Sequence, residues 1–298
     1  MKPIRHTLAA MALMMTCAAA EAETYSGTLK KIQETGVITL GHRESSVPFS
    51  YYNDKQQVIG YSHELMLKAV EAIRAAVKKD DLQIRLLPVT SANRITLVQN
   101  GSVDLECGST THNPERARQV AFSTTIFIVS TRLLTKKDSG VLDFPDLAGK
   151  NMVTTAGTTS ERLIRKMNEE KKMRMNIISA KDHGESFLTL ETGRAAAFMM
   201  DDALLYGEVA KSKRPGEWRV TGTPQSSEAY ACMMRRDDPA FKAVVDQALT
   251  AAMTTGEAER LYQKWFRSPI PPKGLNLEFE LPDAMRALFK NPNDKSFD

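Results

Sequence analysis

The hydrophobic positions of this chain alternate between the helical period and short apolar runs. After Ser62, a candidate N-cap, the apolar residues over 65–77 follow the 3.6-residue period of an amphipathic helix. Short runs rich in β-forming residues lie on both sides, at 37–40 and 83–89. An alternation of strands and helices predicts a parallel sheet with helices on both faces.

This alternation occurs twice, which predicts two lobes. The first series also contains a short helix ending at Gly36, a hairpin at 49–59, a short helix between Asn93 and Gly101, and a strand at 103–107. The second series predicts strands at 151–155, 175–178 and 195–200 and helices at 160–172, 185–191 and 203–211. Two more helices, 239–253 and 257–266, precede a proline-rich tail.

Two extended β-rich runs, 124–134 and 229–234, connect the two series. They predict an α/β fold in which two parallel-rich sheets are joined by two crossing strands, with a ligand cleft between the lobes. The expected boundaries are 23–134 and 225–298 for lobe 1 and 135–224 for lobe 2.

The N-terminal segment has the pattern of an export signal. A basic start is followed by an apolar run at 9–15 and small residues at 16–22. We expect cleavage after Ala22, with Ala20 as the alternative; the residues before Cys17 do not favour lipid attachment there. The apolar run is too short to cross a bilayer as a mature helix, and no other segment could span a membrane, so we expect an exported protein that is soluble after cleavage.

Composition and charge exclude several classes of function. The formal net charge is only +4 and the basic residues are dispersed, which argues against nucleic-acid binding. Beyond the signal, the cysteines are Cys107 and Cys232, both in apolar runs. An oxidising compartment favours a disulfide between them, and two buried thiols are the alternative. Their spacing matches no metal site, and we expect no metal and no cofactor.

Two arginines follow neighbouring predicted strands. Arg43 follows the strand at 37–40, and Ser91 and Arg94 follow the strand at 83–89. The carboxyl ends of parallel strands meet at one edge of a sheet, where ligands bind in open α/β folds. Ser91 could instead cap the short helix. Two arginines at one edge are costly without an anion, and a bidentate carboxylate is their usual partner.

Ser109, Thr111 and Arg116 follow the next strand. Asn113 and Pro114 predict the start of a helical turn that presents Arg116. The alternative is a capping cluster with Arg116 paired to Glu115 at the surface.

Three candidate residues belong to the second series. Thr159 lies between a strand and a helix, where backbone N–H groups favour a carboxylate or phosphate. A Walker sequence is absent, so a nucleotide is disfavoured. Asp201 follows the strand at 195–200 and suits an ammonium group, and His183 gains weight only beside these residues.

Taken together, these segments resemble the family 3 extracellular solute-binding proteins of ABC importers for polar amino acids, most closely the members for glutamate and aspartate. The resemblance covers essentially the whole mature chain. Its segments are 41–52, 93–94, 106–111, 114–116, 126–136, 157–160, 178–184, 199–202 and 265–272.

The resemblance implies a role for each candidate. Arg116 would bind the ligand α-carboxylate, and Asp201 the α-ammonium. Ser109, Thr111 and Thr159 would assist Arg116. The side-chain carboxylate of an acidic ligand would be surrounded by Arg43, Ser91, Arg94 and His183.

The charges of these residues agree with an acidic ligand. Three arginines against Asp201 give an excess of +2, and a neutral ligand would leave an arginine buried and unpaired. The resemblance therefore implies a periplasmic monomer that captures L-glutamate or L-aspartate and delivers it to the permease subunits of an inner-membrane ABC importer. One methylene separates the two ligands, so the choice between them stays open.

Two other functions are compatible with this fold. A periplasmic dehydratase-like enzyme would need an acid or base, for which His183 and Glu44 are the candidates. The sequence offers no nucleophile–base pair, so we do not expect an enzyme. A ligand sensor would require a separate membrane partner.

Overall fold

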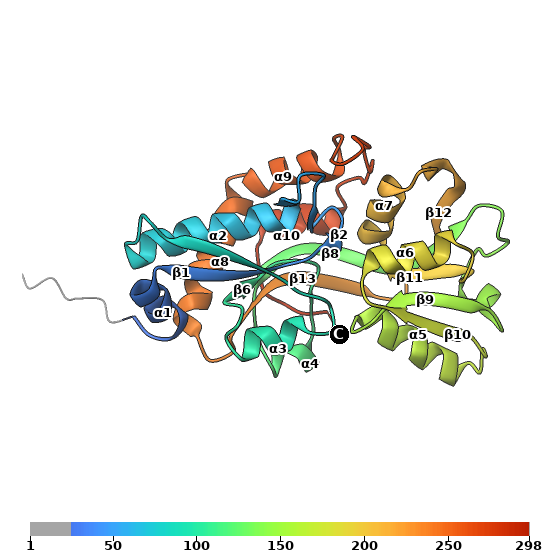
Figure 1. The fold of residues 1–298 in the computed structure, drawn as a ribbon, viewed down its shortest axis with the longest axis horizontal. Helices are drawn as coiled ribbons and strands as arrows, with labels where there is room; N and C mark the ends of the chain where they lie inside the picture. The colour runs from blue at the N-terminus through green and yellow to red at the C-terminus, as the bar shows by residue number, and fades with distance from the viewer. Residues whose placement is uncertain (1–24, 298) are drawn as a thin grey trace, which may run out of the picture.

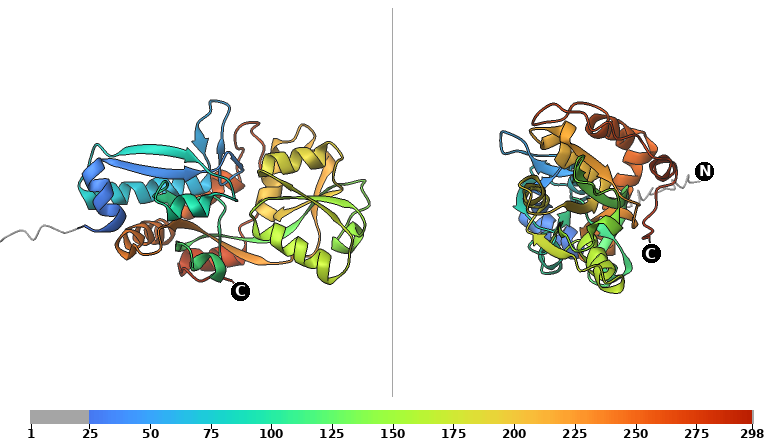
Figure 2. Two further views of the ribbon diagram at one scale, coloured as in Figure 1. Left: turned by 60° about the horizontal axis from the view of Figure 1, so that its bottom comes forward. Right: turned by 90° about the vertical axis from the view of Figure 1, so that its right-hand side faces the viewer.

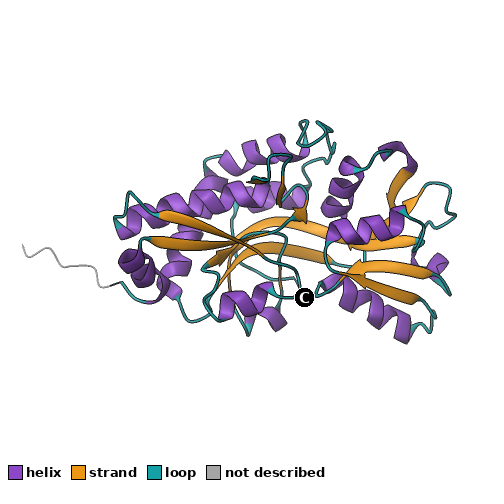
Figure 3. Cartoon of the chain, viewed as in Figure 1, coloured by secondary structure: helices purple, strands orange, loops and turns teal. Residues whose placement is uncertain are grey.

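The computed structural model describes residues 25–297, so the predicted signal segment 1–22 lies outside the described residues. Two lobes lie side by side along the longest axis of the molecule (Figure 1). Strands run through both lobes and helices lie on either side of them (Figure 3). No helix within 25–297 has the length and apolar character needed to cross a membrane.

Lobe 1 is built on three parallel strands in the order β5 (Gln83–Pro88), β1 (Val37–His42) and β6 (Leu105–Glu106). Four helices share one hydrophobic core on one side of them: α1 (Gly27–Thr35), α2 (Tyr61–Val77), α8 (Pro239–Thr254) and α9 (Glu257–Phe266). The short helix α3 (Arg94–Gln99) packs in a separate cluster with Val103 and Phe122. The remaining elements are β2 (Ser45–Ser46), β3 (Ser50–Tyr52), β4 (Val58–Ile59), β7 (Thr111–His112), α4 (Pro114–Ala117) and α10 (Asp283–Lys290).

Lobe 2 repeats this plan with parallel strands in the order β10 (Asn176–Ala180), β9 (Asn151–Thr155) and β11 (Ala197–Asp201). Helix α5 (Thr159–Glu170) lies on one side of the strands, and α6 (His183–Glu191) and α7 (Asp202–Lys211) lie on the other (Figures 1 and 2). The strand β12 (Trp218–Thr221) and the 3-10 helices η1 (Phe144–Leu147) and η2 (Pro215–Glu217) complete it.

Two strands cross between the lobes, as the sequence predicts. The outgoing strand β8 (Ala121–Lys136) pairs with the returning strand β13 (Ser227–Met234) on the lobe 1 side and with β11 and β12 in lobe 2. β-Branched and aromatic residues fill much of β8, which favours the extended conformation over this length. The lobe 2 strands pair with β8, the lobe 1 strands β6 and β7 pair with β13, and β8 and β13 pair with each other, so these two strands connect the lobes.

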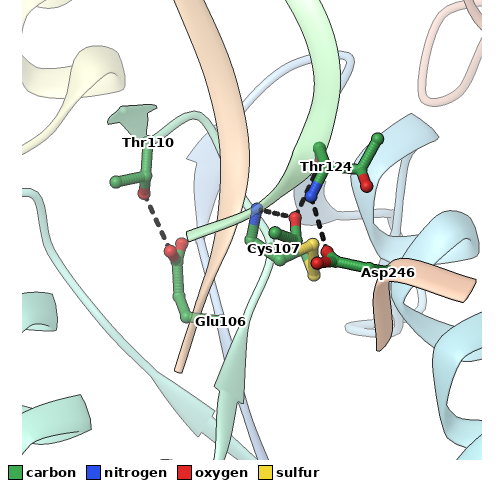
Figure 4. The surroundings of a disulfide bond; sticks show 7 residues. Glu106, Cys107, Thr110, Thr124 and Asp246 are labelled. Carbon is green, nitrogen blue, oxygen red and sulfur yellow. Dashed lines mark hydrogen bonds between the residues drawn. A yellow bond between two sulfur atoms is a disulfide. The ribbon is translucent and has the colours of Figure 1, made fainter. Parts of the chain in front are cut away.

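A disulfide joins Cys107 and Cys232, the pairing that the sequence left open. Both cysteines are fully buried, and Cys232 lies on the returning strand β13. Figure 4 shows two hydrogen bonds near them: the Thr110 hydroxyl donates to Glu106, and the Thr124 backbone N–H donates to Asp246. The cross-link thus fixes the lobe 1 end of β13 beside the strand that leads into Ser109.

Some sequence predictions were wrong in detail. Ser62 is not the N-cap of α2: the cap is Gly60, Ser62 lies inside the helix, and its hydroxyl has no partner among the described residues. Gly60 has a φ of 132°, and a Cβ there would lie 2.3 Å from the Phe49 carbonyl oxygen, so only glycine fits this position. Helix α10 lies where we predicted only a proline-rich tail, and Met285 and Leu288 on it are buried.

Candidate functional site

The candidate residues of both lobes meet where the crossing strands leave lobe 1, and the lobes are closed over them. Arg116 of lobe 1 donates from Nη2 to the Gly157 carbonyl of lobe 2 at 3.2 Å. At the opposite edge, the Gly184 N–H of lobe 2 donates to Ser45 of lobe 1 at 3.4 Å. All nine predicted ligand-binding residues are buried: Arg43, Ser91, Arg94, Ser109, Thr111, Arg116, Thr159, His183 and Asp201.

Arg43 and Arg94 lie next to each other at the carboxyl edge of the lobe 1 strands, as their positions after β1 and β5 predict. Arg43 donates from Nη1 to the Ser109 hydroxyl at 3.3 Å, and Arg94 donates from Nη1 to the Ser109 carbonyl at 3.0 Å. Burial, followed by the charge of Arg94, lowers the pKa of Arg43 to about 10. Arg43 therefore stays charged at neutral pH beside the like charge of Arg94, and burial lowers the pKa of Arg94 as well.

His183 faces these arginines from lobe 2. It is the first residue of α6, its Nδ1 is hydrogen-bonded to the Thr155 hydroxyl at 2.9 Å, and Asp182 caps the helix before it. Burial together with the charges of Arg43 and Arg94 lowers its pKa well below the usual value, so the imidazole is neutral. A neutral imidazole with one nitrogen engaged can still offer the other to a ligand.

Unused hydrogen-bonding groups converge on this side of the site. The Ser91 hydroxyl, Arg94 Nε and His183 Nε2 are buried and have no hydrogen-bond partner among the described residues. Ser91 does not cap α3, since Thr90 and Asn93 bond to each other at the start of that helix instead. Buried groups of this kind are costly unless another polar group meets them. Arg94 is one of these groups and Arg43 lies beside it, which favours an anionic partner.

Arg116 lies on the short helix α4, which Asn113 caps by accepting from the Arg116 backbone N–H. Its guanidinium donates to the Thr111 carbonyl at 3.0 Å as well as to Gly157. The surface pair with Glu115 does not form, because Glu115 bonds to Arg162 of lobe 2. Burial and the charge of Arg94 lower the Arg116 pKa to about 10, which leaves the group charged.

Asp201 ends β11 and accepts hydrogen bonds from two crossing-strand residues, Tyr230 and Thr131, the latter at 3.0 Å. Burial, together with the nearby charge of Glu228, raises the Asp201 pKa to about 8. A cation beside Asp201 would favour its ionised form, so the group is suited to bind an ammonium.

Two buried carboxylates were not among the sequence predictions. Glu106 on β6 and Glu228 on β13 are 0% and 4% exposed, and the charges of both act on Arg94. Glu228 lies one residue before the apolar run we predicted as a strand, and Glu106 lies within another. The excess of +2 expected from the sequence is therefore wrong, because Glu106 and Glu228 were left out of the count. With these two carboxylates included, the positive and negative residues of the site are closer to equal in number than the count of three arginines against Asp201.

The chain has the two-lobed fold of type II periplasmic binding proteins. Residues 38–268 match the bacterial extracellular solute-binding proteins, family 3. The chain belongs to this family.

Three relatives cover most of the chain. A glutamate/aspartate import solute-binding protein of Salmonella typhimurium is 61% identical over 90% of this chain and 89% of its own length. A protein of the same description from Escherichia coli is 57% identical over 97% of both chains. An L-glutamate/L-aspartate-binding protein of Pseudomonas aeruginosa is 60% identical over 92% of this chain and 91% of its own.

Solved structures share the fold at low sequence identity. An arginine-binding protein of T. maritima superposes with a TM-score of 0.72 at 22% identity, covering 80% of this chain and 99% of its own. A solute receptor for L-cysteine of Neisseria gonorrhoeae reaches a TM-score of 0.70 at 23% identity, covering 80% and 92%. The two-lobed arrangement is thus common to binding proteins with different ligands.

Proposed function

We propose that this protein captures L-glutamate or L-aspartate between its lobes and delivers it to the permease of an ABC importer. The convergence of buried, unpaired donors on the Arg43–Arg94 pair carries this proposal, because an extra carboxylate is the group that would satisfy them. Three relatives that are 57–61% identical carry glutamate and aspartate in their descriptions, which supports the same ligands here.

In this proposal, the two ends of the ligand bind opposite sides of the site. Arg116 binds the α-carboxylate with both guanidinium nitrogens, and Asp201 binds the α-ammonium. Ser91, Arg94, Arg43 and His183 surround the side-chain carboxylate. Ser109, Thr111 and Thr159 line the space between them. We also propose that the protein works as a monomer in the periplasm, where its disulfide is stable.

We propose transport rather than catalysis. A dehydratase-like reaction would use His183 and Glu44, but Glu44 is exposed while His183 is buried in the site. The nearby solved fold that relates to such an enzyme is described as an ancestral amino-acid-binding protein, a precursor of cyclohexadienyl dehydratase. It is 24% identical to this chain and shares only the fold.

A thermal-shift panel of amino acids tests the proposed ligands. A ligand stabilises the folded state by RT ln(1 + [L]/Kd), which gives about 2.7 kcal/mol at 100 times Kd. We expect L-glutamate or L-aspartate to raise the unfolding temperature most, and L-glutamine, L-asparagine, L-arginine and L-cysteine to raise it little. A larger shift with a neutral or basic amino acid would reject the proposal.

The closed arrangement of the lobes predicts that a larger residue at Gly207 impairs ligand binding. A Cβ built at Gly207 on α7 would lie 2.0 Å from the Val47 carbonyl oxygen of lobe 1. Gly207→Ala should therefore hold the lobes apart and weaken ligand binding roughly tenfold to a hundredfold, the range of an overpacked contact. Within lobe 2 alone, alanine suits a helix better than glycine, so the ligand-free protein should not lose stability.

Isothermal titration with the best ligand of the panel measures this effect, and thermal unfolding measures the stability. Gly216→Ala is the matched control, because a Cβ there has no atom within 4 Å. Equal affinities for Gly207→Ala and Gly216→Ala would contradict the closed arrangement described above.

A further inference from the structure

Glu228 occupies a position that neither the sequence nor the proposed function explains. It lies on the returning strand β13, opposite Val129 of β8, between the two lobes. Its side chain is 4% exposed, although an unpaired buried carboxylate is strongly unfavourable. Tyr230, two residues on, points to the same side of the strand and donates to Asp201. This face of β13 therefore forms the wall behind Asp201.

One oxygen of Glu228 holds a hydroxyl from each lobe. Oε2 accepts from Thr159 Oγ1 of lobe 2 at 2.7 Å and from Thr111 Oγ1 of lobe 1. Oε1 accepts from Ser226 at 3.1 Å, on the crossing segment itself. Thr159 and Thr111 reach the same oxygen only when the lobes are closed, so Glu228 links them across the cleft.

These bonds also decide what the two threonines can offer a ligand. A hydroxyl has one hydrogen and two lone pairs. When that hydrogen points to Glu228, the oxygen faces the ligand as an acceptor only. Thr111 and Thr159 can then receive an ammonium hydrogen but cannot donate to a carboxylate through their hydroxyls. Glu228 also shares the Thr131 hydroxyl with Asp201, so acceptors at Thr111 and Thr159 would make the Asp201 end of the site selective for a cation.

We propose that Glu228 is a positioning residue that fixes the Thr111 and Thr159 hydroxyls as acceptors for the ligand α-ammonium and holds the lobes closed. The inference deepens the proposed function, but it concerns the ammonium that every amino acid carries. It is therefore independent of which side chain the ligand has. It also reassigns the two hydroxyls from the α-carboxylate, where the resemblance placed them, to the α-ammonium.

The experiment compares Glu228→Met with Glu228→Gln by isothermal titration, using L-glutamate or whichever amino acid gives the largest shift in the thermal panel. Methionine has a similar shape but no comparable acceptor, whereas glutamine retains one acceptor oxygen. We expect a loss of affinity of roughly 100-fold for Glu228→Met and about tenfold for Glu228→Gln. Ser227→Ala is the matched control, because Ser227 precedes Glu228 on β13 but is exposed; it should change affinity by less than about threefold.

A double-mutant cycle separates positioning from general damage to the fold. Thr159→Val should weaken binding about tenfold alone but add almost nothing in the Glu228→Met background, because the hydroxyl acts through Glu228. Additive losses would overturn the proposal, as would affinity within about threefold of wild type for Glu228→Met. Should Glu228→Met not fold, the same cycle with Glu228→Gln decides, with the same two outcomes. Failure of the proposed ligands would appear in the wild-type panel, not in this cycle.

Discussion

Arg116→Ala should abolish detectable binding of both L-glutamate and L-aspartate. Arg116 is a buried guanidinium at the lobe interface, with bonds to Thr111 of lobe 1 and Gly157 of lobe 2. Its removal would leave the ligand α-carboxylate buried without its charged partner and would remove a tie between the lobes. Truncating one member of a buried charge pair costs about 3–5 kcal/mol, which corresponds to a loss of roughly 10²- to 10³-fold or more in affinity.

Isothermal titration and thermal shift with both amino acids measure this loss. Arg118→Ala is the matched control, because Arg118 follows the same short helix but is exposed. It should bind both ligands as wild type does, since exposed charges contribute little. Retention of affinity within tenfold by Arg116→Ala would show that another group binds the α-carboxylate.

Arg43→Ala should change which ligand the protein prefers rather than whether it binds an amino acid. Arg43 lies beside Arg94, and each guanidinium makes one hydrogen bond to Ser109. Without Arg43, the side-chain carboxylate loses one of two cationic partners, whereas a neutral side chain loses no ion pair. We expect L-glutamate affinity to fall by about 100-fold or more and the affinity for L-glutamine to change much less.

The ratio of the dissociation constants for L-glutamate and L-glutamine, measured by titration on both variants, reports this change. Arg43→Lys is the useful comparison, because lysine retains the charge but not the planar fork. It should keep part of the preference. A wild-type ratio in Arg43→Ala would place the side-chain carboxylate elsewhere in the site.

The sequence predicts the framework well because its information is local. The strand at 151–155 and the helix at 257–266 have the predicted bounds in the structure, since each is bounded by turn residues and shows a clear period. Helix α10 was missed because prolines near it suggest an irregular tail, whereas burial of Met285 and Leu288 against lobe 1 stabilises it. Tertiary packing of that kind leaves no local signal.

The candidate site also has residues that the sequence predicts and residues that it does not. Arg43, Arg94 and Asp201 stand within five residues of the ends of predicted strands, and the topology of a parallel sheet brings such positions together. Glu106 and Glu228 lie within strands, where a charged residue in an apolar run is normally assigned to the solvent face. Glu228 contacts Thr159 of the other lobe, and Glu106 contacts Thr110 of lobe 1 and pairs with Met233 of β13. A single strand cannot reveal it.

The disulfide between Cys107 and Cys232 has a consequence for the integrity of the chain. The two cysteines are 125 residues apart in sequence, and every element from β7 to β12 lies in the loop that they close. A protease that cuts once within lobe 2 therefore produces no separate fragment: both new ends belong to one covalent molecule until the bond is reduced. Such a nicked protein would rebuild its second lobe by an intramolecular reaction, at the high effective concentration that a tether provides. In an oxidising compartment, a single cut in lobe 2 therefore does not by itself separate the two parts of the protein.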